Sequence, residues 1–243
     1  MRNDSRRVLV TGGSGDIGSA ICAALARDGW RVIVHAYANR GRADAVAAGI
    51  GEAGGAAEVA TFDLTDAVAT RAVIDDLLQA APIQALVHNA GIHDDAPMAG
   101  MGEEQWRRVI DVSLHGFFHV AQPLLLPMAR ARFGRVVAVS SVAATLGNRG
   151  QVNYAAAKSA LHGAVKSLAR EMASRNITAN VVAPGIIEGR LTDALFAPDQ
   201  IKAMIPAGRT GTPAEVAGVV AFLCSDAASY VNGQVLGVNG GMG

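Results

Sequence analysis

The amino-acid sequence predicts a single α/β domain, a doubly wound parallel sheet of about seven strands with helices on both faces. Three observations predict it. Short β-branched or apolar runs alternate with longer helical stretches along the whole chain. A glycine-rich turn separates the first run from the first helix. Polar residues recur where several runs end, and ligands of such sheets bind beyond the carboxyl ends of strands.

The expected strands are short, and turn residues end most of them. They are the runs 7–11, 31–35, 58–64, 83–88, 136–139, 176–183 and 234–238. Helical stretches fall between them, near residues 19–26, 42–53, 67–80, 103–130, 153–174 and 213–224. Thr212 and Pro213 mark the last helix start as cap and first-turn residue. No repeat or linker interrupts this order, so we expect residues 1–243 to form one domain.

Composition excludes several classes of protein. The 243 residues carry 21 basic and 21 acidic side chains, which argues against nucleic acid or an anionic membrane as the main partner. No apolar run approaches the ~18 residues of a transmembrane helix, and the glycine turn interrupts the first apolar run, which argues against a signal peptide. Cys22 and Cys224 lie among apolar neighbours without metal-ligand spacing. We therefore expect a cytoplasmic protein with buried thiols and no metal.

The glycine turn over residues 12–18 is a candidate phosphate cradle. It reads Gly-Gly-Ser-Gly-Asp-Ile-Gly, between the first strand and the first helix. Glycine lets the backbone approach phosphates, and a helix N-terminus offers free N–H groups and the positive end of a dipole. The spacing of Gly13, Gly15 and Gly18 fits G-x-G-x-x-G, which alone is weak, and such a turn can also bind nothing.

The end of the second strand bears on the choice of cofactor. A carboxylate there would hydrogen-bond the ribose 2′-hydroxyl of NAD, but the first acid after the strand is Asp44. Arg40, with His35 or Arg42, could instead meet a 2′-phosphate, which favours NADP. The alternative is that both arginines simply begin a solvated helix.

Tyr154 and Lys158 form the candidate catalytic pair. They lie four apart in an alanine-rich run, which places both on one helix face. A nearby ammonium lowers the pKa of a phenol from about 10, and such a tyrosine can exchange a proton with an alcohol or carbonyl oxygen. Ser141 follows the 136–139 strand and could hold the same oxygen. The alternative is an ordinary exposed pair on a helix.

Together these motifs resemble the short-chain dehydrogenase/reductase family over essentially the full length. The motifs are Thr11-Gly12…Gly18, Asp63-Leu64, Asn89-Ala90-Gly91, Ser141, Tyr154-x-x-x-Lys158, Pro184-Gly185 and Asn239-Gly240-Gly241-Met242. Within the family the chain most resembles the 3-oxoacyl-[acyl-carrier-protein] reductases, through residues 147–154 and the region Arg209-x-Gly211-x-Pro213. The resemblance implies a Rossmann-like fold, an NADP(H)-dependent oxidoreductase of fatty-acid or lipid metabolism, and a homotetramer.

The resemblance also implies a role for each matching residue. Tyr154 would give a proton to the carbonyl oxygen as NADPH delivers hydride, Lys158 would bind the nicotinamide ribose, and Ser141 would take the serine role. The implied cofactor contacts are Gly12, Ser14, Gly15, Ile17, Gly18, Arg40, Asp63, Leu64, Asn89, Ala90, Gly91, Tyr154, Lys158, Pro184, Gly185 and Ile187. Acidic acyl carrier protein would dock on Arg132 and Arg175, which could also be solvated helix ends. The segment 186–211 is a candidate substrate-covering flap or a plain loop.

Three positions depart from the family pattern. Asp16 replaces a glycine, and its carboxylate would repel a pyrophosphate unless it points away and caps the helix. Ser113 replaces the catalytic Asn that holds a relay water; serine is shorter but still hydrogen-bonds, so we expect slowed turnover. Gly189 replaces a Thr that can contact the nicotinamide amide.

The sequence is compatible with three functions. The first is NADPH-dependent reduction of a 3-oxoacyl thioester. The second is the same chemistry on a free ketone or secondary alcohol, which predicts activity on small carbonyls and indifference to Arg132 and Arg175. The third is a cofactor-binding subunit with weak or no turnover, which Asp16 and Ser113 favour and the intact catalytic set opposes.

Overall fold

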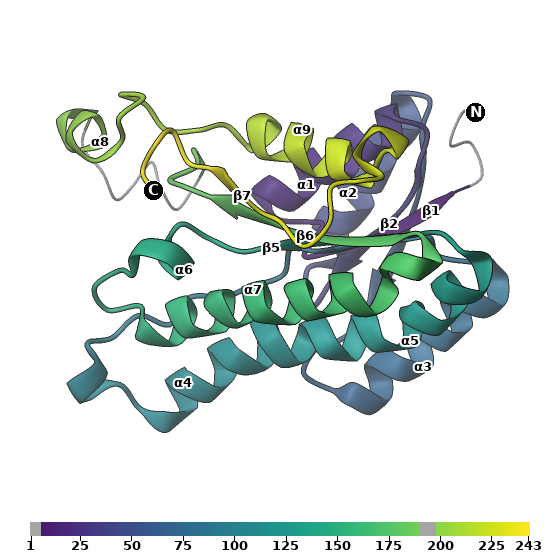
Figure 1. The fold of residues 1–243 in the computed structure, drawn as a ribbon, viewed down its shortest axis with the longest axis horizontal. Helices are drawn as coiled ribbons and strands as arrows, with labels where there is room; N and C mark the ends of the chain where they lie inside the picture. Colours follow the sequence, from purple (N-terminus) through teal and green to yellow (C-terminus); the bar gives the residue numbers. More distant parts are fainter. Residues whose placement is uncertain (1–5, 190–197) are drawn as a thin grey trace.

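Seven parallel strands form one sheet in the order β3-β2-β1-β4-β5-β6-β7 (Figure 1). The computed structural model describes residues 6–189 and 198–243. The strands are β1 (Arg7–Thr11), β2 (Arg31–Ala36), β3 (Ala56–Thr61), β4 (Ala85–His88), β5 (Gly134–Val139), β6 (Ile177–Pro184) and β7 (Val235–Val238). This confirms the predicted doubly wound sheet. Strand order reverses between β1 and β4, so the crevice for ligands lies beyond their carboxyl ends.

Helices cover both faces of this sheet, as predicted (Figure 1). One face carries α1 (Asp16–Arg27), α2 (Arg40–Glu52) and α9 (Pro213–Cys224). The other carries α3 (Ala67–Ala80), α4 (Glu103–Ile110), α5 (Gly116–Ala131) and α7 (Val152–Met172). The 3₁₀ turn η3 (Ala173–Arg175) follows α7 directly, at the end of the helix predicted over 153–174. Helices α6 (Ala143–Leu146) and α8 (Pro198–Met204) and the 3₁₀ turns η1 (Met98–Gly100) and η4 (Asp226–Ala228) were not predicted. They are too short to show a helical period in the sequence.

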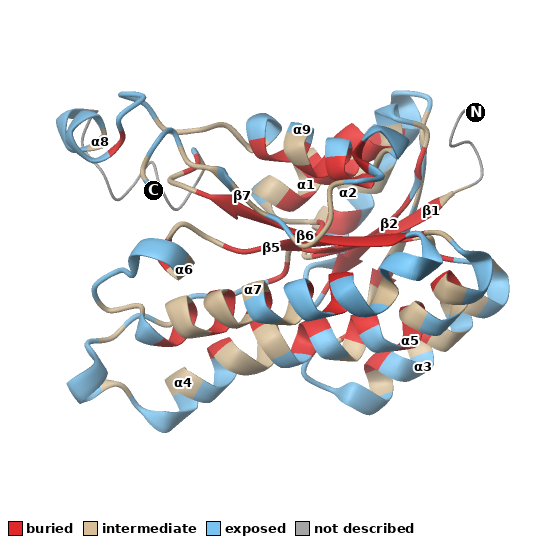
Figure 2. Cartoon of the chain, in the orientation of Figure 1, coloured by how far each residue is buried: buried red, intermediate tan, exposed pale blue. Residues whose placement is uncertain are grey.

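An apolar core lies on each side of the sheet, and Figure 2 shows the central strands buried throughout. On one side Leu25 of α1 and Val216 of α9 belong to the same buried cluster. On the other side Leu124 of α5 and Leu161 of α7 belong to a second cluster. Strands buried on both faces read as continuous apolar runs, which is why the sequence revealed them.

The stretch predicted as one helix over residues 103–130 contains a π-helical turn, η2 (Asp111–His115), between α4 and α5. By length and composition, Glu103–Ala131 could cross a membrane. Core helices pass the same test, and here Phe117, Val120 and Leu124 are buried in the core. Single π-turns inside helices are frequent at functional sites, and this one contains Ser113.

Candidate active site

The glycine turn is fixed by the strands on either side of β1. The N–H of Gly13 donates to the carbonyl of His35 at 2.8 Å, and the N–H of Gly12 donates to His35 Nδ1 at 3.1 Å. From β4, the Asn89 amide donates to the carbonyl oxygens of Thr11 and Gly12, at 3.3 and 3.1 Å. The side chain of Asn89 therefore clamps the turn.

His35 cannot meet a 2′-phosphate, so that part of the cofactor prediction is wrong. Its ring is buried, and its Nε2 donates to the carbonyl of Phe62 at 3.0 Å while Nδ1 accepts from Gly12. Burial lowers the pKa of His35 to about 4, against the opposing effects of the Phe62 hydrogen bond and Asp63. The imidazole is therefore neutral and structural.

The N-terminus of α1 has the shape of a phosphate cradle. Gly15 is the N-cap residue and provides no side-chain cap. A Cβ on Gly18 would lie 2.1 Å from the carbonyl oxygen of Gly12, and Gly12 itself has a φ of +63°, so both positions require glycine. The backbone N–H groups of the first helical turn can thus approach an anion closely. The residues fit the pyrophosphate of a dinucleotide.

Arg42, rather than Arg40, lies beside this cradle. Asp16 is the first residue of α1, and its carboxylate lies 3.4 Å from Arg42 Nη2. Arg40 instead pairs with Asp44 along α2 at 3.6 Å. A Cβ on Gly189 would lie 3.0 Å from Asp16 Oδ2, so two of the departures from the family pattern lie against each other.

Tyr154 and Lys158 are both buried near the start of α7, so the interpretation as an exposed pair is wrong. The Lys158 Nζ lies 5.9 Å from the centroid of the Tyr154 ring. It donates to the carbonyl oxygens of Val139 and Ala90, at 2.9 and 3.4 Å. Burial lowers the pKa of Lys158 to about 8. A buried ammonium beside a buried phenol is a chemically active arrangement.

Ser141, which follows β5 by two positions, lies close enough to the Tyr154 hydroxyl to affect its pKa. Burial raises the pKa of Tyr154, the Ser141 side chain lowers it, and Asp95 raises it further; the net shift is upward. The Tyr154 pKa is therefore raised in this structure rather than lowered, because burial outweighs the effect of Ser141 and the Lys158 ammonium is directed at backbone carbonyls. Neighbouring Ser140 donates instead to the carbonyl of Lys158 at 3.0 Å, so Ser141 and not Ser140 lies beside the tyrosine hydroxyl.

Ser113 lies in the π-turn beside Lys158. A Cβ on Gly91 would lie 2.9 Å from Lys158 Nζ and 3.6 Å from Ser113 Oγ, so Gly91 leaves room between these two polar atoms. Ser113 Oγ is buried, and no other described residue gives it a hydrogen bond. His88 Nε2 donates to the Ser113 carbonyl at 2.9 Å and thereby anchors the π-turn to β4. This geometry leaves the hydroxyl available to a small ligand such as water.

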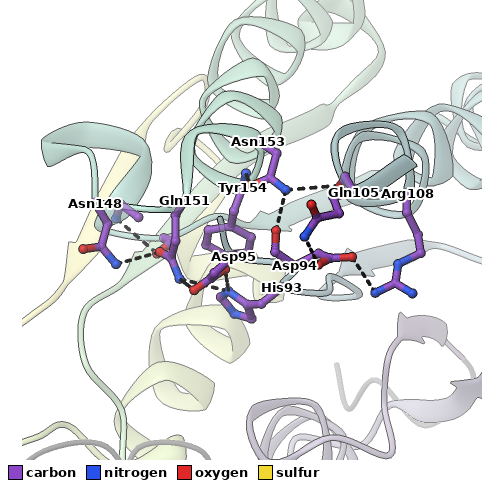
Figure 3. Close-up of polar contacts among 11 residues, drawn as sticks. His93, Asp94, Asp95, Gln105, Arg108, Asn148, Gln151, Asn153 and Tyr154 are labelled. Atoms are coloured by element: carbon purple, nitrogen blue, oxygen red, sulfur yellow. Dashed lines mark hydrogen bonds and ion pairs between the residues drawn. The ribbon is translucent and has the colours of Figure 1, made fainter. Parts of the chain in front are cut away.

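Figure 3 shows residues around Tyr154 that the sequence analysis missed. The ring of His93 stacks on the Tyr154 ring with centroids 4.1 Å apart. The Gln151 amide donates to Asp95 at 2.8 Å, and the N–H of Ala96 donates to the carbonyl of Gly150 at 2.9 Å. The only signal was position, because His93 follows Asn89-Ala90-Gly91 closely and Gln151 precedes Tyr154 by three residues.

The remaining predicted cofactor contacts also lie in or near the carboxyl edge of the sheet. Asp63 and Leu64 follow the end of β3 at Thr61, and the Asp63 carboxylate accepts from Thr65 in a local turn. Gly185 directly follows β6 and packs so closely that a Cβ would lie 2.7 Å from Asn239 Cα. Three further members are Ser14 in the turn, Ile17 packed on the core and Ile187 bridged to Gly211.

Arg132 and Arg175 lie far from this edge. Arg132 ends α5 just before β5, and Arg175 lies just before β6. The Arg132 guanidinium donates to the carbonyl of Ser174 at 3.2 Å, which brings the two segments together. Tyr154 and Arg175 are separated by 21 residues, almost all helical, or roughly 30 Å. The two arginines thus form a basic pair at the opposite, amino edge of the sheet.

Part of the predicted covering segment 186–211, residues 190–197, lies outside the described residues. The described part contains α8, and Glu188 pairs through its N–H with the carbonyl of Gly211 at 2.8 Å. Both cysteines are buried, as predicted, and burial raises the pKa of each to about 12. Within the described ranges no group of three metal-binding side chains occurs.

Several known proteins resemble this chain over nearly its whole length. The family model described as "Enoyl-(Acyl carrier protein) reductase" matches residues 13–243. The chain is 42% identical to 3-oxoacyl-[acyl-carrier-protein] reductase FabG of Escherichia coli (strain K12), covering 100% of this chain and 99% of FabG. It is 44% identical to 3-oxoacyl-[acyl-carrier-protein] reductase MabA of Mycobacterium bovis, covering 98% of this chain and 93% of MabA. A solved structure from Agrobacterium tumefaciens, provisionally assigned as a gluconate dehydrogenase, matches with a TM-score of 0.94 at 31% identity, over 99% of this chain and 96% of that one.

Proposed function

The chain belongs to the short-chain dehydrogenase/reductase family, and we propose that it reduces a 3-oxoacyl thioester on acyl carrier protein to the 3-hydroxyacyl thioester with NADPH. The observation that carries the chemistry is the set of Ser141 with the buried Tyr154 and Lys158, beside a cradle that fits a dinucleotide. The reductase relatives support the substrate class, because they match over nearly their full length.

The mechanism follows from the positions of these three side chains. When bound, the nicotinamide cofactor supplies the hydride that reduces the carbonyl carbon. Ser141 holds the substrate oxygen and the Tyr154 hydroxyl together, and Tyr154 gives its proton to that oxygen. The Lys158 ammonium, 5.9 Å from the ring, stabilises the phenolate that is left. Ser113 holds the water that returns a proton towards Lys158.

The deciding experiment measures NADPH oxidation with three substrates: a 3-oxoacyl-carrier thioester, a small 3-oxoacyl thioester and free hydroxy or keto acids. Turnover of the thioesters, with the carrier-bound one preferred, supports the proposal. Turnover of free acids alone would move the function to small ketones or alcohols, which the likeness to the Agrobacterium structure favours as a second candidate. NADPH binding without turnover on any of them would leave a cofactor-binding subunit.

We further propose that Arg42, beside the glycine turn, binds the 2′-phosphate of NADPH. Arg42→Gln is expected to weaken NADPH binding about tenfold or more and NADH binding by less than about twofold. The substitution removes one charge-assisted contact to the 2′-phosphate, which NADH lacks. Asp16→Asn is expected to strengthen NADPH binding several-fold, because the Asp16 carboxylate, 3.4 Å from Arg42 Nη2, competes with the phosphate for the Arg42 guanidinium. Dissociation constants, measured by nucleotide fluorescence, check both effects.

Arg40→Gln is the matched control, because Arg40 pairs with Asp44 away from the turn. Binding of 2′,5′-ADP against 5′-AMP isolates the 2′-phosphate without any turnover. Loss of 2′,5′-ADP binding in Arg40→Gln, with binding unchanged in Arg42→Gln, would show that Arg40 and not Arg42 binds the 2′-phosphate.

Ser113→Asn is expected to raise kcat by a few-fold. Ser113 Oγ has no hydrogen-bond partner among the described residues, and the longer amide reaches further towards Lys158 with both a donor and an acceptor. Steady-state kinetics at saturating NADPH, with thermal unfolding as a check on packing, measure the effect. An unchanged or lower kcat in a stably folded variant would remove Ser113 from the proton relay.

The remaining expectations concern assembly and docking. We propose one domain over residues 1–243, with 186–211 covering the substrate. Exposed Phe118 and Leu126 on α5 provide apolar surface for a homotetramer interface. We propose that carrier protein docks on Arg132 and Arg175. Given the roughly 30 Å to Tyr154, a carrier docked there needs either an arm of that length or the active site of another subunit.

A further inference from the structure

The imidazole of His93 covers one face of the Tyr154 phenol (Figure 3). The ring centroids are 4.1 Å apart and the planes differ by 29°, which is a stacked arrangement. Tyr154 keeps only 8% of its surface exposed, whereas the His93 side chain is 46% exposed. The imidazole therefore lies between the phenol and solvent, on the loop that leaves β4 two residues after Gly91.

Hydrogen bonds orient this imidazole. The amide nitrogen of Gln151 donates to His93 Nδ1 at 3.3 Å and to the Asp95 carboxylate at 2.8 Å. Asn148 donates to the amide oxygen of Gln151 at 2.8 Å, which fixes the orientation of that amide. Because an amide nitrogen only donates, Nδ1 of His93 accepts, and this assigns the proton of the neutral ring to Nε2.

Burial, supported by Lys158, keeps His93 neutral against the opposing effect of Asp95. Asp95 lies 3.9 Å from Nδ1 on the same loop, and Lys158 faces it from α7. Burial lowers the pKa of His93, Asp95 raises it and Lys158 lowers it, with a net shift downward. Asp94 instead accepts from Gln105 and pairs with Arg108, at 2.7 and 2.8 Å. His93 is thus an uncharged aromatic cover at neutral pH.

We propose that His93 is a positioning residue for Tyr154. The His93 imidazole, oriented by Gln151 and Asp95, holds the phenol against Ser141 and keeps water from it during proton transfer. The inference deepens the proposed function and rests on it, since Tyr154 is taken as the proton donor. Small displacements of a reacting group are costly, and a 1 Å misplacement can lower a rate about 100-fold. A stacked aromatic ring restricts such displacement of the phenol.

Two substitutions at the same position separate the ring from its nitrogens. His93→Ala removes the cover and is expected to lower kcat about tenfold, because the phenol is no longer held. His93→Phe keeps a flat ring over Tyr154 and is expected to stay within about twofold of the wild type. Gln151→Leu removes the donor that orients the imidazole and is expected to fall between them. A His93→Ala enzyme with wild-type kcat overturns the proposal.

Ultraviolet titration tests the same inference without turnover. The chain has three tyrosines, so the difference between each protein and its Tyr154→Phe counterpart isolates Tyr154. Water reaching the phenol in His93→Ala is expected to lower the Tyr154 pKa by about one unit, whereas His93→Phe leaves it unchanged. An unshifted titration in His93→Ala overturns the proposal. If the wild type reduces no carbonyl, the proposed function fails, and this titration still decides whether His93 covers Tyr154.

Discussion

Tyr154→Phe is expected to lower kcat for carbonyl reduction by about 10²–10⁴-fold, because it removes the proton donor and keeps the ring. The phenol is buried, Ser141 lies beside its hydroxyl, and its ring centroid is 5.9 Å from Lys158 Nζ, so this hydroxyl is well placed to give the proton. NADPH binding is expected to persist, because the cradle at α1 is untouched. Initial rates with the thioester and a separate binding measurement check the two halves.

Tyr230→Phe is the matched control for this prediction. Tyr230 is fully exposed, and the same deletion of a hydroxyl there is expected to leave kcat within about twofold. A Tyr154→Phe protein that still turns over at more than about a tenth of the wild-type rate would show that another group supplies the proton. Thermal unfolding of both variants excludes misfolding as the cause of any loss.

Acidification is expected to destabilise this fold strongly below about pH 6.5, because two buried imidazoles must stay neutral. Burial lowers the pKa of His35 to about 4, and burial, followed by Lys158, lowers that of His88 to about 3. An unfolded chain binds protons at both rings near pH 6.5, whereas the folded chain does not. Stability is therefore fully present above about 6.5 and falls as pH drops towards 4 for His35 and 3 for His88.

The size of this effect follows from proton linkage. Each ring contributes a slope of about 1.4 kcal/mol per pH unit within its window. The free energy of unfolding, from urea titrations at about pH 7 and pH 5, is expected to fall by about 2 kcal/mol for each ring. Other groups titrate as well, so the comparison between variants isolates each histidine.

His35→Asn tests this linkage directly. The variant keeps an acceptor for the Gly12 N–H. It is expected to be less stable at pH 7, but its free energy of unfolding should change less with pH, by the contribution of one histidine. An identical pH dependence in the wild type and His35→Asn would contradict the role of the buried neutral ring.

The fold and the Ser141, Tyr154 and Lys158 set were predictable because the signals for them are local. Strands buried on both faces read as continuous apolar runs, and glycine and proline separate them from helices. Four-residue spacing on a helix placed Tyr154 and Lys158 on one face, and a position just after a strand placed Ser141 near the carboxyl edge.

Local periodicity and spacing in the sequence are therefore enough to predict the sheet, its helices, the glycine turn and the candidate catalytic residues. Only the folded chain shows which arginine lies beside the cradle, that His35 is buried, and that burial raises the Tyr154 pKa. It alone placed His93 on Tyr154, a residue 61 positions away. Contacts, burial and pKa depend on distances between residues far apart in sequence, and a linear pattern does not contain those distances.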